Sequence, residues 1–527
     1  MNCIRTLTLT ILAGLLTAAF GQTPVTQQKL LKPSADSWPM YNGDYSGRRY
    51  SSLKAINSTN VTSMSLGWVY RPTAGGANIA LKSTPLIVNG VMYVSAPDHV
   101  WAADARTGRE LWHFSWQSKG GLHIGNRGVA ISGNWLYFET PDCNLVSLAI
   151  KDGKERWHKS ICDLDQMYYG TVAPLIIGNH VIVGVSGDDL DIPGYISSHD
   201  PETGEMQWRW YAHPEPGDPE ARTWPNVEAM MHGGGMTWGS STYDPTLNLL
   251  YFGTGNAQPV TAGKARTGDN LYTASIIALN PENGKMAWYF QPTPHDTHDW
   301  DNTQAPVLID GTLNGQPRKL LALASRSGYF VVLDRTNGKN VLTAPFVDAN
   351  WAKGVDSKGQ PISNPAKEPQ IDGALVNPNQ AGAANWQPPA FNPDTGLFYV
   401  DAANAYSVWY LYDTDDKPEG WAGNDRGGYS EAFMTALDYK TGKARWTHKW
   451  EGGARSGLLT TAGNLVFTTG SSNDVVALNA TTGAALWHAY LGNSGVTNSP
   501  ITYELDGIQY VVVGAGDTVY AFAMFSK

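Results

Sequence analysis

The segment Val100-Trp-Ala-Ala-Asp104, followed by Thr107-Gly108 and Trp112, is the pattern that decides the fold. An alternating apolar strand ends at an Asp, a short turn closes on a Gly, and a Trp follows four residues later. The pattern returns along the chain, with Leu342 once replacing the Trp, at Asp152, Gly153 and Trp157; Asp200, Gly204 and Trp208; Asn280, Gly284 and Trp288; Asp334, Gly338 and Leu342; Asp438, Gly442 and Trp446; and Asn479, Gly483 and Trp487. A degenerate copy lies at 392–396, and 518–522 forms an unmatched last strand.

This repeat predicts a propeller, because the closest copies are separated by roughly forty to fifty residues, the length of one blade. Each Gly permits a positive-φ turn between outer strands. Each Trp can wedge between neighbouring blades. We therefore predict an all-β, eight-bladed β-propeller in which the repeated Gly and Trp residues are structural. Chain ends that meet in one blade would close the ring and remove free sheet edges.

Length and composition agree with this prediction. A propeller can use most of a 527-residue chain as one domain, expected here at 22–527. The content of 56 Gly, 20 Trp and 25 Tyr suits many short strands and tight turns. A formal net charge of −10 argues against nucleic acid as a partner.

The N-terminus has the layout of a secretory signal peptide at 1–21, with Arg5 before an apolar run and small residues before Gln22. The alternative is a buried N-terminal helix. Since no second long apolar run follows, we expect a periplasmic or secreted protein without a membrane anchor. Export would allow Cys143 and Cys162 to pair, but the sequence leaves the pairing open.

Two intervals depart from the repeat. The spacing roughly doubles between Gly204 and Gly284 and again between Gly338 and Gly442. Long insertions on a rigid scaffold commonly line a site. The first contains the Gly-rich stretch 231–238, and the acidic run 295–301 follows it.

Several motifs in order carry a family resemblance. They are Trp38-Pro-Met-Tyr-Asn-Gly-Asp44, Asn126-Arg-Gly128, Thr171-Val-Ala-Pro174, Ser186-Gly187, Tyr251-Phe-Gly-Thr-Gly-Asn256, Gly268-Asp-Asn-Leu-Tyr272, Thr293-Pro-His-Asp296 and Asn385-Trp386. The chain resembles the quinoprotein alcohol dehydrogenases, such as methanol and ethanol dehydrogenases, without a cytochrome c domain. The resemblance implies an eight-bladed propeller that holds pyrroloquinoline quinone (PQQ) and Ca²⁺ or a lanthanide ion in its central funnel.

The resemblance also assigns residues to roles. Trp238 matches the tryptophan on which the quinone stacks; its alternative reading is one more core Trp. The polar cofactor contacts are implied to be Arg127, Thr171, Ser186, Gly187 and Asn385. The metal ligands are implied to be Asp189, Asn256, Asp299 and Asp301.

The expected chemistry needs a base and an electrophile. An alcohol becomes a good hydride donor once Asp299 removes its hydroxyl proton. Arg326 and the cation would polarise the quinone. Asp301 resembles the extra carboxylate of the lanthanide-using branch, although a solvated or turn-capping role is the alternative. The spacing of His295 and His298 also raises zinc, which prefers closed nitrogen and sulfur ligand sets.

Four positions depart from the family pattern. Lys82 replaces a glutamate, Gly121-Leu122 replace an adjacent cysteine pair, Arg455 replaces a tryptophan beneath the cofactor, and Asp189 shortens a glutamate. Lys82 and Arg455 can bind the cofactor's carboxylates, or they can mean that the pocket holds no quinone.

Three functions remain open from the sequence. The first is a dehydrogenase of a small alcohol or polyol, passing electrons to a separate soluble acceptor such as cytochrome c, because no Cys-X-X-Cys-His motif is present. The second is a non-catalytic propeller with an empty or altered funnel. The third is a related quinone enzyme acting on a sugar or polymer.

Overall fold

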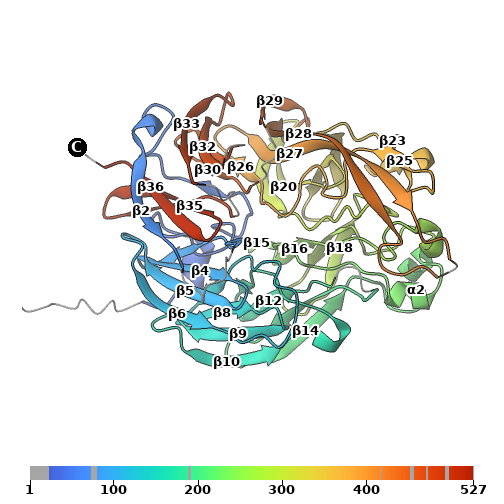
Figure 1. Ribbon diagram of the computed structural model, residues 1–527, viewed down its shortest axis with the longest axis horizontal. Coiled ribbons are helices and arrows are strands. Elements are labelled where there is room, and N and C mark those ends of the chain that lie inside the picture. Colours follow the sequence, from blue (N-terminus) through green and yellow to red (C-terminus); the bar gives the residue numbers. More distant parts are fainter. Residues whose placement is uncertain are drawn as a thin grey trace, which may run out of the picture.

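The computed structural model describes residues 23–72, 80–187, 191–415, 417–451, 456–470, 473–492 and 498–525. The expected signal peptide at 1–21 and two site candidates, Asp189 and Arg455, lie outside these ranges. The described chain is a ring of β-sheets, with short helices α1 (Gln27–Leu31) and α2 (Val227–Met231) (Figure 1). The prediction of an all-β propeller is confirmed.

Consecutive hairpins build the sheets in chain order. The first two are β3 (Leu86–Val88), β4 (Val91–Ala96), β5 (His99–Asp104) and β6 (Glu110–Ser115), then β7 (Ala130–Ser132), β8 (Trp135–Glu139), β9 (Asn144–Ala149) and β10 (Glu155–Ser160). The next two are β11 (Leu175–Ile177), β12 (His180–Gly184), β13 (Tyr195–His199) and β14 (Met206–Tyr211), then β15 (Thr242–Asp244), β16 (Leu249–Gly253), β17 (Ile276–Leu279) and β18 (Met286–Phe290).

The second half of the ring is less regular. It contains β19 (Val307–Leu313), β20 (Gln316–Ala324), β21 (Tyr329–Asp334) and β22 (Asn340–Pro345), then β25 (Ala374–Val376), β26 (Ala390–Asn392), β27 (Leu397–Leu411), β28 (Gly423–Asp438) and β29 (Ala444–Lys449). The small sheet of β23 (Ala352–Val355) and β24 (Pro361–Ser363) lies within the predicted second insertion.

The last two sheets combine the two ends of the chain. One contains β1 (Tyr50–Ser51), β30 (Leu459–Thr461), β31 (Leu465–Thr469), β32 (Asp474–Asn479) and β33 (Ala485–Tyr490). The other contains β2 (Ser65–Tyr70), β34 (Ile501–Leu505), β35 (Ile508–Ala515) and β36 (Thr518–Ala523). Across the described ranges this gives eight sheets of four or five strands beside the small two-stranded one.

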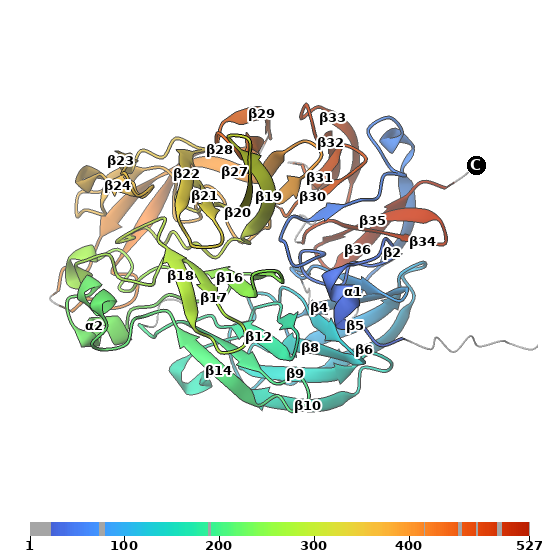
Figure 2. The same ribbon diagram turned by 180° about the vertical axis from the view of Figure 1, so that it is seen from behind.

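The ring closes through strand pairing between the two chain ends. β2 pairs antiparallel with β36, so that Trp68 lies opposite Ala521. Figure 2 shows β2, β34, β35 and β36 side by side. The predicted closure in one sheet is therefore present, and it leaves β2 and β36 without free edges toward each other.

The repeated Gly and Trp residues pack against each other between sheets. A Cβ added at Gly153, where φ is +68°, would lie 2.5 Å from the Trp112 ring. The Trp112 indole N–H donates to the Ile150 carbonyl at 3.0 Å. The same Gly–Trp contact occurs at Gly204 with Trp157, Gly284 with Trp208, Gly338 with Trp288, and Gly483 with Trp446. Leu342 takes the Trp position against Gly442, which confirms the structural reading of the repeat.

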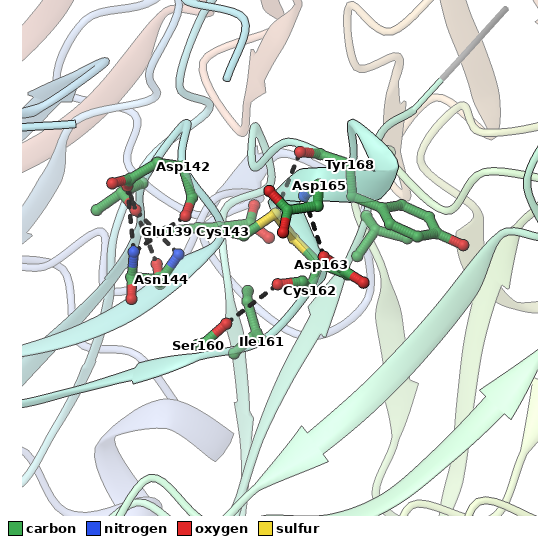
Figure 3. The surroundings of a disulfide bond; sticks show 12 residues. Glu139, Asp142, Cys143, Asn144, Ser160, Ile161, Cys162, Asp163, Asp165 and Tyr168 are labelled. Atoms are coloured by element: carbon green, nitrogen blue, oxygen red, sulfur yellow. Dashed lines mark hydrogen bonds between the residues drawn. A yellow bond between two sulfur atoms is a disulfide. The ribbon is translucent and has the colours of Figure 1, made fainter. Parts of the chain in front are cut away.

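A disulfide joins Cys143 at the start of β9 to Cys162 after β10 (Figure 3). The pairing that the sequence left open is therefore present. Cys143 Sγ also lies 3.2 Å from the Tyr168 carbonyl oxygen, beside the segment that leads to Thr171. None of the helices in the described ranges has the length and apolar character needed to span a bilayer.

Candidate functional site

A cavity of about 180 Å³, here called the central pocket, lies among the loops that precede or follow the strands of neighbouring sheets. Its lining residues are Lys82, Ile124, Gly125, Arg127, Tyr169, Thr171, Ser186, Trp238 and Trp386. Five predicted cofactor residues, Lys82, Arg127, Thr171, Ser186 and Trp238, are therefore brought together from five different loops.

The polar wall of the pocket is a connected hydrogen-bond network. Arg127 Nη1 donates to Thr171 Oγ1 at 2.5 Å, and Thr171 Oγ1 lies 3.0 Å from Ser186 Oγ. Main-chain bonds hold the same segments together, from Arg127 N to Thr171 O and from Tyr169 N to Ser186 O, both at 3.0 Å. These bonds hold the hydroxyls of Thr171 and Ser186 and the guanidinium of Arg127 together as one wall of the pocket.

Two indole rings flank the guanidinium of Arg127. Its Cζ lies 4.7 Å from the Trp238 ring centroid and 5.5 Å from that of Trp386. Such cation–π contacts are favourable, and this one places the Arg127 guanidinium over one face of the Trp238 ring. Trp238 is 8% exposed, so its ring faces the cavity while the rest of the side chain is buried.

Lys82 adds a second cation to the pocket. Its Nζ donates to the Ile124 carbonyl at 2.5 Å. Burial lowers the pKa of Lys82, and the nearby charge of Arg127 lowers that pKa further. None of the described lining residues is acidic. A pocket with two cations and two indole rings is complementary to a planar anion. A quinone that carries several carboxylates is an anion of this kind.

Glu139 lies directly behind the polar wall and is fully buried. Its Oε2 accepts the Val172 N–H at 2.5 Å, and a Cβ at Gly170 would lie 2.5 Å from its Cγ. Burial raises the pKa of Glu139 to about 8, although Val172 N–H and the Arg127 charge oppose that rise. This side chain is therefore mostly neutral near pH 7.

A second group, here called the carboxylate cluster, consists of Asn256, Asp299, Asp301, Arg326 and Gln380. Arg326 Nη1 donates to Asp301 Oδ2 at 2.7 Å, and Arg326 Nη2 donates to Asp299 Oδ2 at 2.8 Å. Burial alone would lower the pKa of Arg326, but the two carboxylates hold it above its usual value. Burial raises the pKa of Asp301, and the Arg326 charge opposes that rise.

The loop between β18 and β19 fixes the two carboxylates. The Asp296 carboxylate accepts the N–H of His298 at 3.2 Å and of Trp300 at 2.9 Å, and burial raises its pKa to about 6. Trp300 stacks on His298 with ring centroids 4.3 Å apart. Asp299 has a φ of +60°, a left-handed conformation that such supported loops can maintain.

Asp301 links the carboxylate cluster to the central pocket. Its Oδ2 accepts the Trp238 indole N–H at 3.0 Å, and its Oδ1 accepts the Asn256 backbone N–H at 2.6 Å. A Cβ at Gly255 would lie 3.0 Å from Asp301 Oδ1, so a glycine permits this close approach. Asp301 is 1% exposed, which excludes the solvated alternative for this residue.

The donor chemistry of the carboxylate cluster suits a hard cation. Two carboxylates bond to one guanidinium, and Asn256 is tied to the same group through its backbone N–H; carboxylate and amide oxygens are donor types that such ions prefer. Within the described ranges, no set of three or more His, Cys, Asp or Glu side chains is arranged to hold a metal. Asp189, the fourth predicted ligand, lies outside those ranges.

The two histidines of this loop are engaged elsewhere. His295 Nδ1 donates to the Gly268 carbonyl at 2.7 Å, and His298 Nε2 donates to the Lys367 carbonyl at 3.0 Å. Burial lowers the pKa of His298 to about 3, so its ring stays neutral. Their main-chain bonds give both rings a structural role in place of the zinc alternative.

The remaining predicted residues take supporting positions. Asn385 Nδ2 donates to the Ala381 carbonyl at 2.9 Å and its Oδ1 accepts Trp386 N–H at 2.7 Å, which orients the indole that lines the pocket. A Cβ at Gly187 would lie 3.0 Å from Ile192. Leu122, in place of the family's cysteine pair, is 54% exposed.

Sequence reasoning missed several residues. Trp386, Tyr169, Ile124 and Gly125 line the pocket; Trp386 belongs to a quoted motif without having been assigned a role, and the other three lie within two residues of quoted motifs. Proximity to those motifs was the available signal. Gln380, which bonds to both Asp299 and Arg326, lies in no motif.

A propeller whose loops place a pocket with two cations and two indoles next to buried carboxylates has the layout of a cofactor-dependent enzyme. The family model described as "Glucose/ethanol/alcohol dehydrogenase, beta-propeller domain" matches residues 38–370. A second model, described as "Outer membrane protein assembly factor BamB", matches residues 430–524. The chain belongs to the PQQ-dependent quinoprotein alcohol dehydrogenases.

Known relatives cover nearly the whole chain. A quinohemoprotein alcohol dehydrogenase of Comamonas testosteroni is 39% identical over 91% of this chain and 72% of its own length. The quinoprotein alcohol dehydrogenase PedH of Pseudomonas putida is 36% identical over 96% of this chain and 91% of its own length. A solved europium-containing methanol dehydrogenase superposes with a TM-score of 0.86 at 29% identity, covering 94% of this chain and all of that one.

Proposed function

We propose that Asp299 is the general base and Arg326 the electrophilic group of a PQQ-dependent dehydrogenase acting on a small alcohol or polyol. The observation that carries this proposal is the buried Asp299–Arg326–Asp301 cluster, joined through the Trp238 indole to a pocket with two cations. A carboxylate beside an electron-withdrawing cation suits proton removal from a hydroxyl and polarisation of an acceptor carbonyl.

The cofactor contacts follow from the chemistry of the pocket. Trp238 offers a flat face, and Lys82 and Arg127 offer charge to carboxylates. Hydrogen bonds to the cofactor are assigned to Thr171, Ser186, Gly187, Asn385 and Arg455. Bound PQQ supplies the two-electron acceptor that no protein side chain can provide.

The protein's own groups act on the substrate proton. Asp299 receives the hydroxyl proton, and Arg326 Nη2, at 2.8 Å, keeps the carboxylate oriented. Trp300 and His298, the neighbours of Asp299 in the same loop, are both buried, which limits the access of water to this part of the loop. Proton removal raises the electron density on the carbon that gives up hydride.

The cation is assigned to Asp189, Asn256, Asp299 and Asp301. Calcium suits these oxygen donors, and a lanthanide gains more from the three carboxylates because it carries a higher charge. The similarity to a europium-containing methanol dehydrogenase supports the lanthanide.

Export and electron transfer complete the proposal. Removal of 1–21 would deliver a single propeller domain, 22–527, to the periplasm or outside the cell. Electrons would leave to a soluble acceptor such as cytochrome c.

One observation favours a second candidate, a non-catalytic propeller with an altered funnel. The Arg127 guanidinium lies 4.7 Å above Trp238, on a face that a stacked quinone needs, and Lys82 stands nearby. Titration of the purified mature protein with PQQ, with calcium or lanthanum, tests both. We expect about one equivalent bound; the absence of saturable binding with either metal would replace the dehydrogenase by this candidate.

A further inference from the structure

We propose that Gln380 is a positioning residue for alcohol oxidation, holding the Asp299 carboxylate in the orientation that accepts the substrate proton. The inference rests on the proposed role of Asp299 as the base. Gln380 lies in the loop between β25 and β26, about eighty positions from Asp299 in the sequence, and no motif includes it.

Gln380 contacts both members of the central ion pair. Its side-chain Nε2 donates to Asp299 Oδ2 at 2.6 Å. The same oxygen accepts Arg326 Nη2 at 2.8 Å. The backbone carbonyl of Gln380 in turn accepts that Nη2 at 2.6 Å. The three groups therefore form a closed hydrogen-bonded triangle around one carboxylate oxygen.

The loop that carries Gln380 is anchored independently of any substrate. Gln380 N donates to Asp425 Oδ2, on β28, at 3.1 Å. The Trp300 indole N–H donates to the Asn379 carbonyl at 3.2 Å, and Ala383 N donates to the Arg326 carbonyl at 2.8 Å. Because three separate segments hold this loop, the position of the Gln380 amide is set by the fold.

The neutral amide of Gln380 limits the orientations that the Asp299 carboxylate can adopt. Two donors on Oδ2 restrict rotation of the Asp299 carboxylate about its Cβ–Cγ bond. The amide adds no charge, so it orients the base without a second counter-ion. A misplacement of a reacting group by about 1 Å can reduce a rate by roughly a hundredfold, which makes orientation here worth measuring.

The test compares Gln380→Ala, Gln380→Glu and a matched control, Gln370→Ala, in the PQQ- and lanthanum-loaded enzyme. Gln370 is an exposed glutamine of the same insertion whose amide donates to the Ala366 carbonyl. We expect Gln380→Ala to lower kcat roughly ten- to a hundredfold with little change in KM. Gln380→Glu should lower kcat further, since its carboxylate repels Asp299. The control should match the wild type.

Two further measurements separate positioning from a structural role. We expect Gln380→Ala to bind PQQ and Tb³⁺, followed by absorbance and by luminescence, as the wild type does. We also expect a larger kinetic isotope effect with the alcohol deuterated at its reacting carbon, because the chemical step becomes slower.

The outcomes that overturn the inference differ from those that overturn the proposed function. If Gln380→Ala keeps wild-type kcat while Asp299→Asn is inactive, Gln380 has no positioning role and the base assignment stands. Loss of PQQ or Tb³⁺ binding in Gln380→Ala, or kcat and KM changing in proportion, would also reject positioning. If Asp299→Asn itself turns over normally, the base assignment fails, and Gln380 with it.

Discussion

The central pocket and the carboxylate cluster lie next to each other, but they differ in how their charged side chains are paired. In the cluster, each carboxylate of Asp299 and Asp301 is already bonded to Arg326, and both side chains are nearly inaccessible to solvent. In the pocket, Lys82 and Arg127 border an open cavity of about 180 Å³. The carboxylate cluster is closed by its own ion pairs, whereas the two cations of the central pocket border a cavity that a ligand can enter.

This difference separates the effects that substitutions should have. Removing one member of a buried ion pair leaves an uncompensated charge, which is costly. Substitutions in the carboxylate cluster should therefore change turnover and metal selectivity. Pocket substitutions should change cofactor affinity, because Lys82 and Arg127 line the cavity that the cofactor would occupy.

Asp299→Asn should reduce kcat by about a hundred- to ten-thousandfold, because an amide cannot accept the hydroxyl proton. PQQ binding should persist, since Asp299 does not line the central pocket. Steady-state turnover with a small alcohol and a PQQ titration measure the two effects separately. Near-normal turnover in this variant would remove Asp299 from the mechanism and end the functional contrast between the two regions.

Asp301→Ala should favour calcium over a lanthanide, lowering lanthanum affinity by roughly ten- to a hundredfold relative to calcium affinity. The physical reason is the loss of one carboxylate next to a trivalent ion. Asp301→Asn, which keeps the side-chain volume, serves as the second variant against a folding failure. An enzyme that works with calcium alone and does not respond to either variant would contradict the lanthanide assignment.

Lys82→Ala should weaken PQQ binding about tenfold, the effect of one charge-assisted hydrogen bond. Lys151→Ala, at an exposed lysine in the turn between β9 and β10, is the control and should bind as the wild type does. Isothermal calorimetry with both variants gives the ratio. Unchanged affinity in Lys82→Ala would show that the charge of the pocket does not select the cofactor.

In the Glu139→Gln variant, the stability of the folded protein should fall less with rising pH than it does in the wild type. The folded pKa of Glu139 is about 8 against an ordinary value of 4.5, so its stabilising contribution is complete below pH 4.5 and is lost as the pH rises through 8. Thermal unfolding between pH 5 and 9 should show Tm falling less in the variant, by about two degrees. Parallel curves for the two proteins would mean that Glu139 does not titrate in this window.

The repeat made the fold predictable because its physics is local. A turn glycine and an indole a few residues apart recur along the chain, and the contact of Gly153 with Trp112 shows that the glycine of one sheet packs against the indole of the sheet before it. The Cys143–Cys162 pairing was not predictable in this way, since sequence spacing does not fix which thiols meet.

The site was predictable only where motifs carried it. Trp238, Arg127 and Asp301 stand in recognisable stretches, and the structure brings them to adjoining places. Gln380 had no such signal, because its contact with Asp299 depends on how two loops far apart in the sequence pack. The contribution of Asp301 as a bridge between Trp238 and Arg326 likewise follows from three-dimensional proximity alone.

The pairing of β2 with β36 sets the order in which the molecule can be completed. Residues 65–70 cannot form their strand pair until residues 518–523 are present, so the ring stays open until almost the whole chain has been synthesised. Contacts between such distant segments form slowly because a very long loop must close first. The ring therefore closes only when β36 pairs with β2. Before this pairing the chain consists of stacked hairpins, and after it the sheets form a closed ring able to hold a small molecule.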